Sequence, residues 1–494
     1  MEHRNSTLAP RAAWWRGGLC ALLALLFLRL LLMAWLPLTD TTEARYAEIA
    51  RKMLETGDWV TLLHDYGVPF WAKPPLSTWL SALSMGLFGQ NEFAVRLPSL
   101  LLSLGVLGLV GSLANRRAGG EMALATMLML ASSLLFFAAA GAVMTDPALL
   151  FCTTLILVAF WRAMAGDGRV WGYTFFVGVG LGLLAKGPVS LVLSGLPIFF
   201  WVLLQRQWPA LWRCLPWLSG TLLALLIAAP WYIWAELRTP GFLDYFIVGE
   251  HLQRFLDSGW QGDKYGFAHA TPHGMIWLYA LVALLPWSLV VPLWLLSQRG
   301  QAGTERVAND GWLTYLLLWS CMPLVFFSLS GNVIFPYSLP MLPGACLLFA
   351  ELWRRARRPG SLPWLASITI ALGLLATTLQ AALPERLLRT QKAVIAHWQA
   401  LRPDSDSQLL YWSKRREFSA EFYSSGLAHT TRDGATLRER VAAPSRDFLI
   451  IDADDLAQLP TDLHARFERL DAVEVKGNTM LILGERPNSR EGSQ

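Results

Sequence analysis

The side chains of this chain that could carry acid, base or phosphate chemistry stand between its apolar stretches, or at their ends. Carboxylates accept protons, and Arg and Lys bind phosphate, Arg through paired hydrogen bonds and Lys as a point charge. In chain order, this set is Asp40, Glu43, Arg45, Lys73, Asp146, Lys186, Glu250, His251 and Arg254. If the apolar stretches bring them to one membrane face, they form a site for a lipid-borne substrate.

The composition is that of a polytopic membrane protein with a modest soluble part. Of 494 residues, 54% are hydrophobic and 16% are charged. The net charge of +5 does not indicate nucleic-acid binding, because the Arg residues lie in short loops rather than on one soluble face. The 5 cysteines lie in or beside apolar stretches without metal-ligand spacing, which predicts small buried side chains.

Apolar stretches of about 16–24 residues predict about eleven transmembrane helices. The first stretch is too long for the core of a signal peptide and no cleavage site follows it, so we expect a retained helix. The predicted spans are 18–37, 93–114, 121–140, 147–165, 170–186, 187–205, 214–236, 274–297, 312–330, 334–352 and 363–382.

Basic residues alternate between the loops, and this predicts the orientation. Short loops rich in Arg and Lys stay in the cytoplasm, so we expect a cytoplasmic N-terminus and an external C-terminal segment. Residues 74–88 are apolar but short, and a span there would move every later basic loop outward. We therefore expect an interfacial helix there. The loops assigned to the cytoplasm contain Arg116, Arg117, Arg162, Arg169, Arg206, Arg213, Arg299, Arg306, Arg354, Arg355, Arg357 and Arg358.

Two units follow from this division. Residues 1–383 form a transmembrane domain with a first external loop at 38–75 and a second at 237–273. Residues 384–494 form a small external α/β domain with strand-like runs at 409–412 and 448–452 and a hairpin turn at 476–478. The fold class is an α-helical polytopic membrane protein with this small α/β domain.

The first external loop contains an amphipathic helix. Its apolar positions from Thr42 to Glu55 have helical spacing, and Gly57 ends the helix. Asp40 and Glu43 therefore stand at a helix start, within plausible reach of Lys73. Acids at a helix start are more often caps than catalysts, so the chemical interpretation depends on the ensemble.

The motifs of this loop and of later segments resemble a known family. They are TEARYAEIARKML, KPPL from Lys73, TDP from Thr145, KGP from Lys186, EHLQRF from Glu250 and PYSLP from Pro336. In this order, over about residues 15–350, the chain resembles the bacterial aminoarabinose (4-amino-4-deoxy-L-arabinose) lipid A transferases. These belong to the protein-mannosyltransferase-like group of glycosyltransferases with the C-type membrane fold.

The resemblance implies a fold, a place and a reaction. Such enzymes take a sugar from a polyprenyl phosphate at the outer face of the inner membrane, and this branch passes it to lipid A. We therefore expect an inverting glycosyltransferase of the bacterial inner membrane whose C-terminal domain is periplasmic. The implied partners are a polyprenyl-phosphate-linked sugar and a lipid acceptor in the membrane, and no nucleic acid.

The resemblance also implies catalytic residues, with one departure. Alignment on Arg45 places Glu43 on the family's Glu, but Thr42 stands where the family has Asp. We expect Asp40 to replace that acid, with Glu43 as the second candidate. Asp146 either supports catalysis or caps its helix, which Pro147 follows.

The donor phosphate would contact cations. Lys73 matches the family's phosphate-binding Lys, and Arg45 and Lys186 are expected to assist, although Lys186 could simply extend to the interface. Tyr337 is expected to bind substrate. The family has a Lys shortly before this Tyr, and here Val333 occupies that position.

The second external loop supplies the acceptor side. His251 and Arg254 are expected to bind the acceptor phosphate, or to pair with Glu250 and order the loop. The sequence assigns no certain cofactor. A divalent metal at Glu250 and His251 stays open, but the family's ligand before Lys-Pro-Pro is here Ala72, which removes one ligand.

Two other function classes stay open. A protein O-mannosyltransferase would share the fold and the type of donor but accept a peptide. A transporter for a lipid-linked sugar would place its charges near the membrane midplane in repeated halves. The chain shows no internal repeat, and nearly all the selected charges fall at one face.

Overall fold

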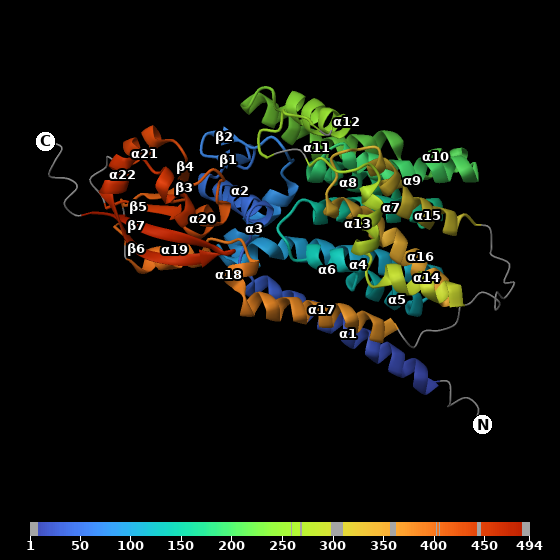
Figure 1. Ribbon diagram of the computed structural model, residues 1–494. Helices are drawn as coiled ribbons and strands as arrows, with labels where there is room; N and C mark the ends of the chain where they lie inside the picture. Colours follow the sequence, from blue (N-terminus) through green and yellow to red (C-terminus); the bar gives the residue numbers. More distant parts are fainter. Residues whose placement is uncertain are drawn as a thin grey trace.

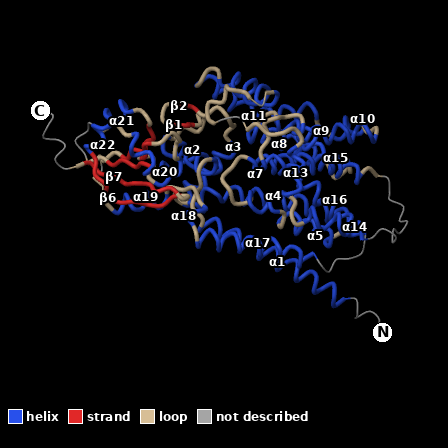
Figure 2. Tube along the Cα trace, in the orientation of Figure 1, coloured by secondary structure: helices blue, strands red, loops and turns tan. Residues whose placement is uncertain are grey.

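The computed structural model describes residues 8–257, 259–266, 269–297, 310–355, 362–401, 403–404, 406–441 and 446–486. Figure 1 shows a bundle of helices with a smaller lobe containing a sheet at one end. Strands are found in that lobe and in a short hairpin beside it, and the bundle itself is helical (Figure 2). Arg299, Arg306, Arg357 and Arg358, which were expected in cytoplasmic loops, lie outside the described residues.

Every stretch predicted as a span is largely helical, which confirms the fold class. Within the described part of the chain, five helices are long and apolar enough to cross a membrane: Trp14–Trp35, Glu92–Ala118, Asp146–Met164, Trp217–Arg238 and Phe335–Arg355. The bundle helices are α1 (Leu8–Trp35), α4 (Glu92–Ala118), α5 (Gly120–Ala131), α6 (Leu134–Ala139), α7 (Asp146–Met164), α8 (Arg169–Lys186), α9 (Val189–Gln205), α10 (Trp208–Cys214), α11 (Trp217–Arg238), α13 (Met275–Ala283), α14 (Trp287–Ser297), α15 (Trp312–Ser328), α16 (Leu342–Arg355) and α17 (Leu362–Ala382).

Two predicted spans are broken, for different local reasons. The stretch 121–140 divides into α5 and α6 at Ser132 and Ser133, whose hydroxyls donate to the carbonyls of Leu128 and Met129. Such bonds to the preceding turn bend helices. The stretch 274–297 divides into α13 and α14 before Trp287, where Pro286 lacks the N–H that a continuous helix needs.

The segment expected to be the first external loop forms α2 (Thr42–Thr56), the hairpin β1 (Leu63–Asp65) and β2 (Val68–Pro69), and α3 (Leu76–Phe88). The predicted amphipathic helix is confirmed, and it ends at Gly57 with a φ of 68°. The 13 residues of α3 span about 20 Å, less than the roughly 30 Å of a bilayer core. Packed against α2 and α4, this helix has the length expected of an interfacial element.

The terminal lobe is a sheet of five strands in the order β4-β3-β5-β7-β6. The strands β3 (Leu409–Trp412), β4 (Ala428–Thr431) and β5 (Phe448–Asp452) are parallel, whereas β6 (Phe467–Val475) and β7 (Asn478–Glu485) form an antiparallel hairpin. Its helices are α18 (Pro384–Leu387), α19 (Lys392–Ala400), α20 (Phe418–Tyr423), α21 (Gly434–Arg440) and α22 (Thr461–Arg466). Both predicted strands and the hairpin are confirmed.

Side chains alternate across the sheet and form a core on each face. Leu409 and Tyr411 pack with Trp398 of α19 on one face, and Leu410 and Leu437 of α21 lie on the other. The sheet therefore has two hydrophobic cores within a lobe that follows the last bundle helix.

The lobe is joined to the first external loop by a shared core. Phe418 and Phe422 of α20 are buried in one cluster with Ile49 and Met53 of α2. Beside it, the buried Lys52 Nζ lies 2.9 Å from the Glu421 carboxylate. Figure 1 shows α20 next to α2 at the end of the bundle from which the lobe extends. This contact fixes the loop that leads to Lys73.

Candidate functional site

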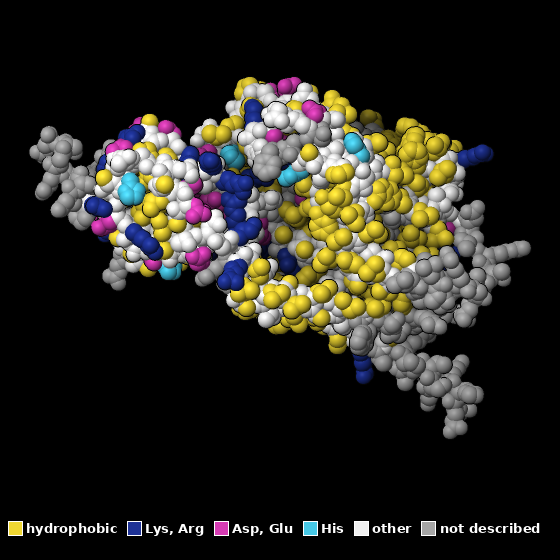
Figure 3. Space-filling model, viewed as in Figure 1, with side chains coloured by type: hydrophobic (Ala, Val, Ile, Leu, Met, Phe, Trp, Pro, Cys, Tyr) yellow, Lys and Arg dark blue, Asp and Glu magenta, His cyan; other side chains and the backbone are white. Residues whose placement is uncertain are grey.

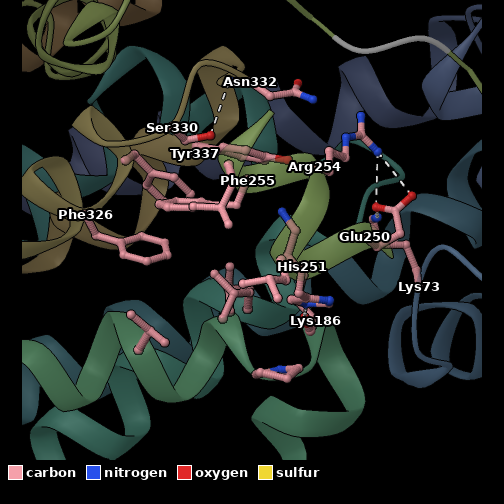
Figure 4. A pocket seen from close by; sticks show the side chains of 17 residues that line it. Lys73, Lys186, Glu250, His251, Arg254, Phe255, Phe326, Ser330, Asn332 and Tyr337 are labelled. Atoms are coloured by element: carbon pink, nitrogen blue, oxygen red, sulfur yellow. Dashed lines mark hydrogen bonds and ion pairs between the residues drawn. The ribbon is translucent and has the colours of Figure 1, made fainter. Parts of the chain in front are cut away.

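A cavity of about 390 Å³ opens where the two external loops meet the bundle. Cationic side chains lie toward one end, and the rest of its wall is mostly apolar, with the polar side chains of Ser330 and Asn332 among it (Figure 4). It is lined by Lys73, Leu149, Lys186, Pro188, Val189, Val192, Glu250, His251, Leu252, Arg254, Phe255, Leu256, Phe326, Phe327, Ser330, Asn332 and Tyr337.

A tight connection between α8 and α9 brings Lys186 to this cavity. Lys186 ends α8, and Gly187 reverses the chain with a φ of 72°. A Cβ at Gly187 would lie 2.6 Å from the ring of Phe246, so only glycine permits this approach. Phe246 belongs to η2 (Asp244–Gln253), which continues into α12 (Arg254–Leu256). The turn thus positions Lys186 and the second external loop together.

Glu250 holds two of the cations. Its carboxylate lies 3.3 Å from Lys73 Nζ and 3.1 Å from Arg254 Nη1, and Arg254 also lies 3.3 Å from Asp263. Burial opposes ionisation of Glu250, but Lys73 and Arg254 outweigh it and lower the pKa of its carboxyl. Glu250 is therefore an anion that orders two cationic side chains of the cavity.

Lys186 is held by a second acid. Its Nζ lies 2.6 Å from Asp146 Oδ1 and 4.6 Å from the centre of the Tyr337 ring. Asp146 begins α7 with Pro147 in the first turn, and its contact with Lys186 reaches across 40 residues. Asp146 thus acts on the cavity through Lys186, which is a positioning role.

His251 orders the cavity rather than offering a free nitrogen. Its Nδ1 lies 2.7 Å from the Phe246 carbonyl and its Nε2 lies 3.1 Å from the Lys186 carbonyl. Burial chiefly lowers the pKa of His251, and a neutral imidazole donates through one nitrogen only. His251 therefore links η2 to the end of α8.

Glu250 and His251, where the sequence left a metal open, are not arranged to hold one. Both ring nitrogens of His251 face carbonyl oxygens, and Glu250 lies between Lys73 and Arg254. Within the described ranges, no group of three His, Cys, Asp or Glu side chains is placed to hold an ion.

The structure does not bring Asp40 to this cavity, although the sequence favoured it as the catalytic acid. Its carboxylate accepts hydrogen bonds from the backbone N–H of Ser419, at 3.0 Å, and from the Ser419 hydroxyl. Its own N–H donates to the Arg389 carbonyl at 2.8 Å. Asp40 thus joins the first loop to the C-terminal lobe.

Glu43 and Arg45 are also engaged elsewhere. Glu43 receives two hydrogen bonds of 2.8 Å from Arg96, which also donates to the Met33 carbonyl and so fastens the end of α1. Arg45 donates to the Tyr265 carbonyl at 2.7 Å. The sequence interpretation missed Arg96, whose signal was a charge inside an apolar span.

From the raised pKa of Asp40 we predict that the contact between the first loop and the lobe depends on pH. Burial, with the nearby Glu417 carboxylate, raises its pKa from 3.8 to about 7, against the opposing effects of Ser419 and Arg389. The neutral form therefore stabilises the docked lobe at low pH, and this contribution is lost as the pH rises from about 4 through 7.

Replacing Asp40 by Asn is expected to remove this dependence. At pH 8, the free energy of opening at α20 should be higher in the variant than in the wild type by at least about 1.4 kcal/mol, the value of one pKa unit. Hydrogen exchange of α20, corrected for the intrinsic rate, measures this between pH 5 and 8. A wild-type lobe that opens equally at both pH values would contradict the assignment.

Comparison with known proteins gives the family. Residues 14–246 match the family model of dolichyl-phosphate-mannose-protein mannosyltransferases. An undecaprenyl phosphate-alpha-4-amino-4-deoxy-L-arabinose arabinosyl transferase of Pseudomonas aeruginosa PAO1 is 33% identical over 69% of this chain and 59% of its own length. One from Edwardsiella ictaluri is 31% identical over 62% of this chain and 54% of its own length. The chain thus matches little more than half the length of these relatives.

A solved structure shows the same fold along nearly the whole chain. The crystal structure of ArnT from Cupriavidus metallidurans bound to undecaprenyl phosphate superposes with a TM-score of 0.73 at 20% identity, covering 95% of this chain and 98% of that one. The apo form of the same protein gives a TM-score of 0.72. The sequence matches thus relate this chain to the membrane glycosyltransferases that include the protein mannosyltransferases and the bacterial aminoarabinose transferases, and the superposition shows that it has the fold of this ArnT.

Proposed function

We propose that this protein is an inverting glycosyltransferase of the bacterial inner membrane that moves a sugar, aminoarabinose, from a polyprenyl phosphate to a lipid acceptor such as lipid A. One observation carries the proposal. Lys73, Lys186 and Arg254, from three separate segments, line one cavity whose remaining wall is mostly apolar. A polyprenyl phosphate has the same division between an anionic head and a hydrocarbon tail.

The apolar wall would hold the first isoprene units of the donor. Leu149, Val189 and Val192 come from the bundle, and Phe255 and Phe326 stack with ring centres 4.7 Å apart. Excluding water from this end strengthens the interaction between the cations and the phosphate.

The cations would act on the leaving group. As the bond between the anomeric carbon and the phosphate oxygen breaks, negative charge develops on a phosphate monoester that Lys73, Lys186 and Arg254 stabilise. The acceptor oxygen attacks from the opposite face, which inverts the anomeric carbon. An acceptor that is itself an anionic phosphate attacks without losing a proton, so the reaction then needs no general base.

The acids of the cavity support a phosphate acceptor. Among its described lining residues, Glu250 is the sole carboxylate, and it lies between two cations. A hydroxyl acceptor would need a general base, and a carboxylate held in this way is a weak one. The absence of the family's Asp at Thr42 points in the same direction.

The test is transfer by the purified chain in vesicles. Undecaprenyl phosphate-linked aminoarabinose is the donor, lipid A and a Ser/Thr-rich peptide are offered together, and mass spectrometry follows both. A mass increase of one aminoarabinose on lipid A supports the proposal. Transfer to the peptide would instead indicate the mannosyltransferase-like alternative, and no transfer to either acceptor would contradict both.

The proposed orientation places the N-terminus in the cytoplasm and the C-terminal lobe in the periplasm. Figure 1 shows α2, α3 and the sheet at one end of the bundle and α10, which contains Arg213, at the other. Cysteine labelling at Lys476 in the lobe and at Arg206 beside α10 tests this. Impermeant reagent should reach residue 476 only.

Arg254 is expected to contribute to donor affinity. Replacing it by Ala removes one of the three cations, and we expect KM for the polyprenyl donor to rise about tenfold, near the 1.5–3 kcal/mol of a charged hydrogen bond. Arg238→Ala is the matched control, because Arg238 pairs with Asp58 outside the cavity. Equal KM values for the two variants would contradict the assignment.

A further inference from the structure

A second cavity, of about 360 Å³, lies between the β1–β2 hairpin and the C-terminal sheet. It follows the edge strand β4 and the segment after β3, so it includes the carboxyl ends of two parallel strands, where open α/β sheets bind ligands. Figure 3 shows Lys and Arg side chains gathered along this seam between lobe and bundle. Its volume is that of a small-molecule site rather than of a protein interface.

The cations of this second cavity exceed its acids. Arg416 is neutralised by Asp65 at 3.0 Å and by Glu421 at 2.8 Å. Arg432 lies 2.9 Å from Asp455. Two further cations line the cavity, Lys414 and Arg440, both exposed.

Lys414 and Arg440 have no carboxylate within ion-pair distance among the residues that the structure describes. The two positive charges lie at the side of the cavity that is open to solvent, and no described carboxylate there neutralises them. Burial and then Arg440 lower the pKa of the adjacent His429, so its imidazole is neutral at pH 7. A neutral imidazole and the hydroxyls of Thr431 and Thr436 suit the hydroxyl groups of a sugar.

We propose that this second cavity binds a phosphate group carried on a sugar, with Lys414 and Arg440 as its principal charge contacts. The site is distinct from the donor cavity, yet the two share one loop. Tyr66 lines the second cavity and Lys73 lines the first, so seven residues of chain, at most about 25 Å, connect them. The ligand class fits both a phosphorylated glycolipid head and a free sugar phosphate.

Isothermal titration calorimetry of the full-length protein in detergent tests this, with N-acetylglucosamine 1-phosphate as the probe and N-acetylglucosamine as the uncharged control. We expect the double variant Lys414→Ala/Arg440→Ala to bind the phosphosugar at least tenfold more weakly. Arg415→Ala/Lys476→Ala is the matched control, because it removes the same charge from the lobe outside the cavity. Equal binding by the two double variants, or none by the wild type, would overturn the proposal.

Three additions make the result independent of catalysis. The titration is repeated with Lys73→Met, which impairs the donor cavity and should leave this binding unchanged. Arg440→Glu serves as a second variant if the double one does not fold, and it should also abolish binding. Vesicles containing lipid A distinguish the source, because tighter binding of the vesicles indicates a lipid head and weaker binding indicates a free sugar phosphate. Inorganic phosphate bound as tightly as the phosphosugar would contradict a role for the sugar.

Discussion

Replacing Lys186 by Met is expected to lower kcat for sugar transfer by about 10²–10³, the loss typical of removing one electrostatic contact to a developing anion. Lys186 is buried at the cationic end of the donor cavity, 2.6 Å from Asp146 and against the Tyr337 ring. A cation fixed in this way needs no reorganisation when charge develops on the leaving phosphate. The measurement is kcat under saturating donor in vesicles.

The control distinguishes the loss of a positive charge at the phosphate from a loss of protein stability. Lys186→Met leaves Asp146 buried without its partner, which itself destabilises the protein. In Lys186→Met/Asp146→Asn both charges are removed, so we expect the thermal stability to recover while kcat stays low. Lys264→Met is the matched cation replacement, because Lys264 is exposed in the loop 237–273 and does not line the cavity. A double variant that regains activity would show that Lys186 serves folding alone.

Much of the fold could be predicted because its signals are local. Span lengths follow from hydrophobic runs, and the strands at Leu409–Trp412 and Phe448–Asp452 follow from short β-branched and aromatic runs. The end of α2 follows from Gly57, which adopts the left-handed conformation. The breaks at Ser133 and Pro286 were missed, because a long apolar run hides a bend that tertiary contacts stabilise.

The site could be predicted only where its chemistry is marked by a motif. Lys73, Lys186 and Tyr337 stand within two residues of a proline in short motifs near helix ends, and all three line the cavity. The environment of Asp40, in contrast, is set by Ser419, 379 residues further along the chain. Nothing near Asp40 in the sequence indicates that partner, so an acid at a helix start was interpreted as a catalyst.

The second large effect is expected at the buried charges between α2 and α20, where the first loop again contacts the C-terminal lobe. Lys52 is 1% exposed and its Nζ lies 2.9 Å from Glu421 and 3.2 Å from Glu48. Replacing Lys52 by Met leaves Glu48 with Arg51, and Glu421 with Arg416, as the remaining cation. Removing one partner of a buried pair costs about 3–5 kcal/mol, and these remaining pairs bring the expected cost to the lower end of that range. We therefore expect the free energy of opening of the lobe to fall by an amount of this order.

Hydrogen exchange at α20 and thermal unfolding measure that opening, and a double-mutant cycle assigns it. Lys52→Met, Glu421→Gln and their combination should show a coupling of about 1–3 kcal/mol, since these side chains touch. Arg438→Met is the control, because the Arg438 pair with Asp462 is largely exposed and should change little. Because α2 leads through the hairpin to Lys73, the loosened lobe should also raise KM for the donor. Wild-type exchange at α20 in Lys52→Met would mean that the apolar core of Phe418 and Phe422 holds the lobe without these charges.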